Sequence, residues 1–187
     1  MNKALFLDRD GVINIDHGYT YKVSDLNLLE GVIEGLQAIS HLDYKIFIIT
    51  NQSGIARGLF GIDDLHFFMN YLLKILAKND VNISDYFFCP HHLEGTIKAF
   101  TKKCSCRKPE PGMLHDAQKK YNLDLSQSIL IGDKETDILA GKNAGVPSNI
   151  LITDSILSIR SKASYSAKDL IQAAKIINRL NGAVFSS

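Results

Sequence analysis

The sequence has few cysteines, almost no net charge and no long apolar run, and each absence narrows the range of functions. An odd set of three cysteines disfavours a disulfide-stabilised scaffold. With 21 basic and 20 acidic residues, the chain has no charge excess that would attract nucleic acid or an anionic membrane. No apolar run approaches the roughly 20 residues that span a bilayer, and the amino-terminal residues do not resemble a signal peptide. We therefore expect a cytoplasmic protein without nucleic-acid or membrane partners.

The length and composition are those of one globular domain. A chain of 187 residues can bury a substantial core but is too short for two ordinary domains. Apolar residues make up 45% and charged residues 22%, which is not a disordered composition. Because there is no internal repeat, linker or low-complexity stretch, we expect residues 1–187 to form a single domain.

Short apolar runs alternate with amphipathic segments along the chain. The runs show little polar alternation, which is typical of strands buried on both faces of a parallel sheet. The expected strands are 4–7, 45–49, 86–88, 128–131 and 149–152, and the expected helices are 31–42, 63–78, 111–121, 135–144 and 167–180. This order predicts a doubly wound α/β fold with its site at the carboxyl ends of the strands. Two long irregular segments, 11–28 and 89–108, are typical of functional loops.

Two aspartates, Asp8 and Asp10, directly follow the first expected strand. Unpaired carboxylates at the edge of a core repel each other and are costly to desolvate. A divalent cation that prefers oxygen ligands, such as Mg²⁺, removes both costs. The alternative is a simple Asp-X-Asp-Gly turn at the end of a strand. A later strand delivers a third aspartate, Asp133, followed by Lys134 and Asp137.

Two further segments could bind an anion. The second expected strand ends in Thr50, whose hydroxyl precedes the small-residue stretch Asn51-Gln52-Ser53-Gly54. Lys108 could place a compact charge on a phosphoryl oxygen, and Arg107 could contact a second anionic or polar group with two prongs. Taken separately, the first segment is more readily explained as a polar loop, and the second as a basic surface turn.

All three cysteines lie in one window together with a histidine. The cluster consists of Cys89, His91, Cys104 and Cys106. Three sulfurs and one imidazole suit a tetrahedral Zn²⁺, and four protein ligands would make that zinc structural. It would fix the 89–106 loop and therefore the position of Arg107 and Lys108. Buried free thiols are the alternative to a zinc site, and His92 is the alternative to His91 as a ligand.

The order of these motifs resembles the haloacid dehalogenase superfamily of phosphotransferases, across four motifs and most of the chain. The resemblance implies a Rossmann-like sheet, without a cap domain because the segment after the first strand is too short for one. It also implies that Asp8 is the nucleophile and that Asp10 acts as general acid and then as general base. Mg²⁺ would be held by Asp8, the backbone carbonyl of Asp10 and Asp133.

The same resemblance assigns roles to the remaining motif residues. Thr50 and Lys108 would stabilise the equatorial oxygens of the transferred phosphoryl group. Asp137 would orient Lys134, or the loop around it, instead of binding the metal. The chain after Thr153 matches the superfamily only loosely.

The cysteine loop directly before Arg107 narrows the resemblance to the D-glycero-D-manno-heptose 1,7-bisphosphate 7-phosphatase family. This resemblance favours His91 as the zinc ligand and implies a monomer that acts on a small sugar phosphate. The implied sugar contacts are Asp16, His17, Gly18, Tyr19, Asn51, Gln52, Ser53 and Arg107. The related histidinol-phosphatase domain has a shorter loop, and its substrate or another small sugar phosphate is the alternative. A phospho-receiver signalling domain or a zinc-dependent nucleic-acid module would be a non-enzymatic alternative.

Overall fold

The computed structural model describes residues 1–154 and 161–182, which contain a six-stranded sheet. The strands are β1 (Lys3–Leu7), β2 (Tyr44–Asn51), β3 (Ile83–Cys89), β4 (Ile129–Gly132), β5 (Ser148–Ile152) and β6 (Tyr165–Ala167). They are ordered β3-β2-β1-β4-β5-β6, and every pair of neighbours runs parallel. The predicted parallel α/β architecture is therefore confirmed.

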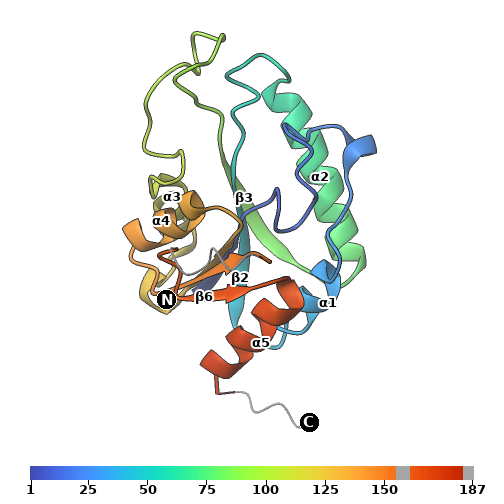
Figure 1. Cartoon of the computed structure of the whole chain (residues 1–187), viewed down its shortest axis with the longest axis vertical. Coiled ribbons are helices and arrows are strands. Elements are labelled where there is room, and N and C mark those ends of the chain that lie inside the picture. The colour runs from blue at the N-terminus through green and yellow to red at the C-terminus, as the bar shows by residue number, and fades with distance from the viewer. Residues whose placement is uncertain (155–160, 183–187) are drawn as a thin grey trace.

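Five helices cover the two faces of this sheet in the described part of the chain. They are α1 (Val32–Gln37), α2 (Ile62–Lys78), α3 (Gly112–Tyr121), α4 (Glu135–Asn143) and α5 (Leu170–Leu180), and short 3₁₀ turns lie at Val23–Asp25 and Leu125–Gln127. Helices α1, α2 and α5 lie on one side of the sheet and α3 and α4 on the other (Figure 1). Among the described residues, no helix has the length and apolarity needed to cross a bilayer.

The core consists of two apolar layers, one on each face of the sheet. In β1, Leu5 and Leu7 pack into the layer under α1, α2 and α5, whereas Ala4 and Phe6 pack into the layer under α3 and α4. All four are at most 1% exposed, so the strand is buried on both faces. Fully burying a side chain such as Leu contributes roughly 1.5–3 kcal/mol. This double burial explains why the strand sequences show no polar alternation.

Three elements differ from the sequence-based expectation. The helix expected over 31–42 ends at Gln37, because the chain continues in tighter i→i−3 turns such as Leu42 N–H to Ile39 O. Strand β3 begins at Ile83 and is longer than expected, since half-buried residues at a sheet edge gave no clear apolar run. The third difference concerns the last helix.

The helix expected over 167–180 is preceded by a strand that the sequence did not reveal. Residues 165–167 form β6, which pairs with β5, and α5 begins only at Leu170. The Asp169 carboxylate caps α5 by accepting a hydrogen bond from Gln172 N at 2.7 Å. A strand of three residues is too short for a periodic pattern. Of the loosely matching tail after Thr153, residues 155–160 and 183–187 lie outside the described residues.

The topology brings the motif residues to one edge of the sheet. Strand β1 lies between β2 and β4, and the carboxyl ends of these three parallel strands lead into Asp8, Thr50 and Asp133. A crevice at the point where the strand order reverses is where open α/β sheets bind ligands. The 89–108 segment leaves β3 at the same edge and rises to the top of the view in Figure 1.

Candidate active site

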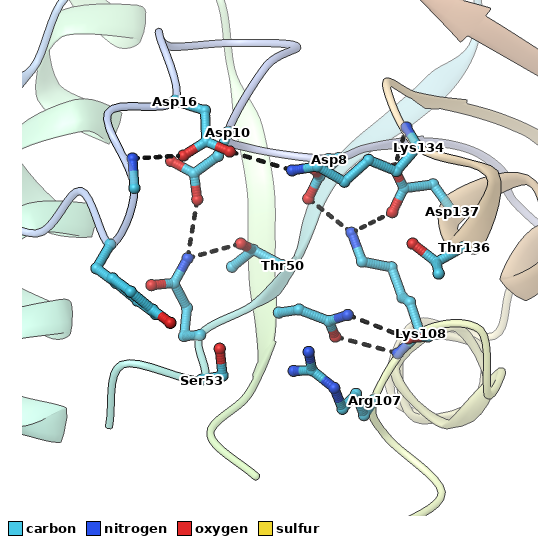
Figure 2. Close-up of a pocket in the computed structure, with 14 residues that line it drawn as sticks. Asp8, Asp10, Asp16, Thr50, Ser53, Arg107, Lys108, Lys134, Thr136 and Asp137 are labelled. Carbon is cyan, nitrogen blue, oxygen red and sulfur yellow. Dashed lines mark hydrogen bonds and ion pairs between the residues drawn. The ribbon is translucent and has the colours of Figure 1, made fainter. Parts of the chain in front are cut away.

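A pocket of about 510 Å³ lies at this edge of the sheet. It is lined by Asp8, Asp10, Asp16, Gly18, Tyr19, Thr50, Asn51, Gln52, Ser53, Arg107, Lys108, Lys134, Thr136 and Asp137 (Figure 2). Of the sequence-predicted residues for catalysis and sugar binding, His17 is not among the lining residues and is exposed to solvent. Segments that are far apart in the sequence therefore meet around one cavity.

Lys108 lies at the floor of the pocket between two carboxylates. Its Nζ is 2.6 Å from Asp8 Oδ1 and 2.7 Å from Asp137 Oδ1, and it donates a third hydrogen bond to Ile49 O at 3.0 Å. The side chain is buried, and burial lowers its pKa, but the charges of Asp137 and Asp8 outweigh burial and raise the pKa overall. Lys108 therefore remains an ammonium ion, and Figure 2 shows it pointing between the two aspartates.

The aspartates around Lys108 carry more negative charge than one lysine balances. Burial, helped by the neighbouring carboxylates, raises the pKa of Asp8 to about 8 against the opposing charge of Lys108. Burial also raises the pKa of Asp133, despite the charge of Lys134. The oxygens of Asp8, Asp133 and Asp137 lie within 4.8 Å of one another, and buried Asp133 Oδ1 has no hydrogen-bond partner. This oxygen-rich, electron-rich cluster fits a hard divalent cation.

Gly11 keeps room for that cluster. Its φ of +86° is in the left-handed region that favours glycine, and a Cβ at this position would collide with the Asp133 carboxylate. The glycine of the Asp-X-Asp-Gly sequence therefore serves both the turn and the approach of Asp133 to β1.

Both carboxylate oxygens of Asp137 have partners within the protein. One carboxylate oxygen pairs with Lys108, and the other accepts a hydrogen bond from the backbone N–H of Lys134 at 3.0 Å. The hydrogen bond to Lys134 N is of the kind expected if Asp137 orients this loop. The ion pair with Lys108 is a contact that the sequence did not suggest. With both oxygens occupied, Asp137 is a poorer metal ligand than Asp8 or Asp133.

A second polar group lies opposite Lys108. Gln52 Nε2 donates to Thr50 Oγ1 at 2.8 Å and to Asp10 Oδ2 at 3.1 Å, which links the second and first motifs directly. Thr50 and Gln52 are both buried, at 1% and 3% exposure, although they line the pocket. Their polar atoms are therefore fixed before any ligand binds, which is how donors for a developing negative charge need to be arranged.

Asn51 and Arg107 connect the pocket to the cysteine loop. The Asn51 side chain accepts a hydrogen bond from Lys108 N at 3.0 Å and donates one to Lys108 O at 3.2 Å. Arg107 Nη1 donates to His91 O at 3.3 Å, and the Arg107 side chain lines the pocket. The Asn51 amide thus clamps the Lys108 backbone, and the position of Arg107 depends on the cysteine loop.

The loop that carries Asp16 to Tyr19 borders the other side of the pocket. Asp16 accepts a hydrogen bond from Gly18 N at 2.9 Å and forms an ion pair with Lys134 Nζ at 3.1 Å. Partial burial raises the pKa of Asp16, but these two interactions outweigh it and lower the pKa. Tyr19 has a positive φ of 57° and remains 45% exposed. The loop therefore offers an ionised carboxylate and an accessible aromatic ring to a ligand.

The four residues predicted for zinc lie together. Five separations among the Cys89, Cys104 and Cys106 sulfurs and His91 Nδ1 are between 3.0 and 3.6 Å. Tetrahedral coordination at a Zn–S distance of about 2.3 Å would separate the sulfurs by roughly 3.8 Å, so a small expansion accommodates the ion. The hydrogen bond between the two thiols lowers the pKa of Cys106 to about 5 and raises the pKa of Cys89, so a bound metal would have to displace the Cys89 proton.

His92 points away from this cluster. Its ring lies 3.4 Å from Arg57 Nη2, and its Nδ1 accepts a hydrogen bond from Glu94 N at 3.1 Å. Of the two adjacent histidines, His91 is therefore the one whose ring nitrogen approaches the thiols.

Comparisons with known proteins agree with this geometry. A family model described as HAD-hydrolase-like matches residues 105–180. The D-glycero-β-D-manno-heptose-1,7-bisphosphate 7-phosphatase of Haemophilus influenzae is 39% identical over 183 residues, covering 96% of this chain and 99% of that protein. The chain belongs to the heptose 1,7-bisphosphate 7-phosphatase family of HAD-like hydrolases.

Relatives for both anomers occur in this heptose bisphosphate phosphatase family. A D-glycero-α-D-manno-heptose-1,7-bisphosphate 7-phosphatase from Photorhabdus laumondii is 45% identical and covers 80% of this chain and 82% of that protein. The crystal structure of D,D-heptose 1,7-bisphosphate phosphatase from B. bronchiseptica, complexed with magnesium and phosphate, has a TM-score of 0.81 and 28% identity. It covers 95% of this chain and 99% of that chain, so the likeness extends over the whole fold.

Two buried polar residues of this family member were not predicted from the sequence. Arg9 and Asn14 are both 0% exposed and donate hydrogen bonds to Asp10. A signal was present for Arg9, because an arginine between two aspartates at the end of a buried strand needs a partner. Asn14 follows the turn without any pattern that would distinguish it. Thr136, which lines the pocket beside Asp137, was also missed.

Proposed function

We propose that this chain is a Mg²⁺-dependent phosphomonoesterase that removes the 7-phosphate from D-glycero-D-manno-heptose 1,7-bisphosphate through an aspartyl-phosphate. The observation that carries the proposal is the convergence of Asp8, Asp10, Thr50 and Lys108 on one pocket. Relatives that share 39–45% of their residues with this chain bear the name of this activity. The geometry supports the reaction, and the relatives support the substrate.

Each of these four residues would have a separate role in the reaction. Asp8 would attack phosphorus in line, while Asp10 protonates the departing sugar oxygen and later accepts a proton from the attacking water. Lys108 and Thr50 would stabilise the charge on the phosphoryl oxygens. Lys108 already contacts Asp8, so its charge lies beside the nucleophile before the substrate binds. The ion pair with Asp137 fixes that charge in place.

Asp8, Asp133 and the backbone carbonyl of Asp10 would hold Mg²⁺. The ion would neutralise the crowded carboxylates and the incoming phosphate, whose charge otherwise opposes attack by Asp8. The raised pKa values of Asp8 and Asp133 and the unpartnered Asp133 Oδ1 support this assignment.

Cys89, His91, Cys104 and Cys106 would hold a structural Zn²⁺. Cys89 ends β3, and Cys106 directly precedes Arg107 and Lys108, so the ion would join the sheet edge to the two basic residues. The 92–103 segment between the paired ligands contains no regular helix or strand, and a metal would replace the core that it lacks.

The open pocket suits a small sugar bisphosphate. Asp16, Gly18 and Tyr19 on one side and Asn51 to Ser53 on the other would contact the sugar, and Arg107 would contact an anionic or polar group remote from Asp8. Between β1 and α1 the only regular element is the 3₁₀ turn Val23–Asp25, which supports a capless site. That the chain forms a single domain, is a monomer and is cytoplasmic stays a prediction. His17 does not line the pocket, so its proposed role in sugar binding rests on its place in the Asp16–Tyr19 loop.

The direct test is a phosphate-release assay with Mg²⁺ on three substrates: the α and β anomers of the heptose bisphosphate and histidinol phosphate. We expect one or both anomers to be cleaved with a higher kcat/KM than histidinol phosphate. Product analysis should show phosphate lost from position 7. Equal or faster cleavage of histidinol phosphate would overturn the substrate assignment, and no cleavage of any phosphomonoester would overturn the phosphatase.

A further inference from the structure

The Arg9 side chain is buried and does not line the pocket, but it contacts the pocket-lining residue Asp10. Its Nη2 lies 2.8 Å from Asp10 Oδ1 and 2.7 Å from Asp10 Oδ2, and its Nε donates to Oδ1 at 3.1 Å. The guanidinium is 0% exposed and lies over the Phe68 ring, 4.7 Å from the ring centre. A buried guanidinium with this geometry is a rigid, permanently charged partner.

The two oxygens of Asp10 have different surroundings. Among the described residues, Oδ1 accepts hydrogen bonds only from the buried residues Arg9 and Asn14, neither of which lines the pocket. Oδ2 accepts from Arg9 and from Gln52, which does line the pocket. Only the Gln52 bond can be replaced by a ligand without opening the core, so Oδ2 is the oxygen that faces the reaction.

Arg9 also reaches the loop that borders the pocket. Its Nη2 donates to Thr20 O at 2.6 Å, and Thr20 Oγ1 accepts a hydrogen bond from His17 N at 3.2 Å. The same guanidinium therefore fixes the direction of the Asp10 carboxylate and the base of the Asp16–Tyr19 loop.

We propose that Arg9 is a positioning residue that directs Asp10 Oδ2 toward the oxygen to be protonated; the inference rests on the proposed phosphatase function. In the first step Asp8 bonds to phosphorus, the bond from phosphorus to the sugar oxygen breaks, and the proton of Asp10 goes to that oxygen. In the second step water bonds to phosphorus, Asp10 regains a proton from the water, and the Asp8–phosphorus bond breaks. Both proton transfers use Oδ2, so both depend on Arg9.

The test uses the leaving group to separate positioning from general damage. A sugar alkoxide needs a proton to depart, whereas nitrophenolate leaves without one, so kcat/KM for p-nitrophenyl phosphate does not depend on Asp10 as an acid. We expect Arg9→Met to lower kcat/KM for the heptose bisphosphate by about 10–100-fold, part of the roughly 10²–10⁴-fold that a positioned acid contributes. For p-nitrophenyl phosphate, kcat/KM of the variant should stay within about threefold of the wild-type value, because this parameter reports the first step. Its kcat and KM should both fall, because the second step, hydrolysis of the aspartyl-phosphate, still needs Asp10 as the base.

Two further variants provide the comparison. Arg9→Lys keeps the charge without the two-pronged geometry and should lie between wild type and Arg9→Met. Lys3→Met removes a cation that lies 4.6 Å from the Tyr44 ring centre, and Lys3 begins β1 at the end opposite the pocket, so both substrates should be unaffected. If Arg9→Met does not fold, Phe68→Leu replaces it, because this change removes only the aromatic ring under the guanidinium. It should lower kcat/KM for the heptose bisphosphate selectively, by a smaller factor than Arg9→Met.

Equal losses of kcat/KM on both phosphate esters, or no loss on either, would overturn the assignment of Arg9. If wild-type enzyme does not cleave the heptose bisphosphate, the proposed substrate fails, and the alkyl phosphate that it cleaves fastest replaces it in the same comparison. The two conclusions therefore fail separately.

Discussion

The Lys108 ammonium balances two carboxylates at once, and this sets the electrostatics of the individual residues. Asp8 and Asp137 raise the pKa of Lys108, while burial and the nearby aspartates raise the pKa of Asp8. The sequence predicted that these charges belong to one site, because each follows an apolar strand or precedes a helix. It could not predict that Asp137 pairs with Lys108, since that contact depends on how α4 packs against the sheet.

Asp8→Asn should abolish turnover and leave the fold intact. The amide cannot form the aspartyl-phosphate, and loss of a nucleophile costs at least about 10⁴-fold in kcat. Because burial already disfavours the charge on Asp8, neutralising it should not lower the melting temperature. Asp85→Asn, made at a residue paired with Lys120 outside the pocket, is the matched control for steady-state assays and thermal unfolding. An active Asp8→Asn enzyme would refute the nucleophile.

Lys108→Met should destabilise the protein as well as inactivate it. Removing the cation leaves the buried Asp137 carboxylate without its partner, which costs about 3–5 kcal/mol, whereas Asp8 can take up a proton because its pKa is already raised. Urea unfolding in the absence of Mg²⁺ measures this cost. The double variant Lys108→Met/Asp137→Asn should regain part of the lost free energy of unfolding, because the stranded Asp137 charge is gone. A single variant as stable as wild type would contradict the ion-pair argument.

At the scale of elements, the strands were predictable because their apolar runs are bounded by the motif residues. Strands β1, β2 and β4 and helices α2, α3 and α4 were anticipated to within a few residues. Strand β6 was not, because its Tyr165–Ala167 segment is stabilised by pairing with β5 and not by its own composition. Arg9 was missed for a similar reason, since its partners Thr20 and Phe68 are brought to it only by the tertiary structure. Asn14 bonds to its neighbours Asp10 and Ile15, but no sequence pattern distinguishes it.

Cys104→Ser should release zinc and loosen the segment that precedes Arg107. Elemental analysis should find one zinc per wild-type chain and less in the variant, and limited proteolysis should cut the variant faster between residues 90 and 103. Because Arg107 and Lys108 follow the last ligand, kcat/KM should fall by about tenfold or more. Ser105→Ala, which changes the exposed residue between two ligands, is the control. Wild-type protein without zinc would exclude the structural metal.

At the scale of the whole molecule, the sheet concentrates negative charge at one edge of a protein whose net charge is only +1. The carboxyl ends of β1 and β4 place Asp8 and Asp133 beside each other, and their lysine partners, Lys108 and Lys134, are shared with Asp137 and Asp16. Burying these carboxylates together is electrostatically unfavourable, and a bound cation would relieve it. That cost predicts how the molecule responds to pH.

Binding of Mg²⁺ should release a proton and strengthen as the pH rises. Burial raises the pKa of Asp8 to about 8, so near neutral pH the metal-free site is largely protonated, and the ion must displace that proton. Between about pH 6 and about pH 8 the affinity should rise by up to about tenfold per unit. Calorimetry in two buffers of different ionisation enthalpy measures the proton directly, and Asp8→Asn should release fewer protons than wild type. A pH-independent affinity would contradict the raised pKa.

The most direct measurement of the central claim is to trap the phosphorylated enzyme. Wild-type protein is mixed with heptose bisphosphate and Mg²⁺, quenched within one turnover and reduced with borohydride, which converts an aspartyl-phosphate to homoserine. Peptide mass spectrometry should locate this change at Asp8 and at no other acidic residue, and Asp8→Asn should show none. Phosphate release without modification of Asp8, or modification of a different carboxylate, would contradict the account.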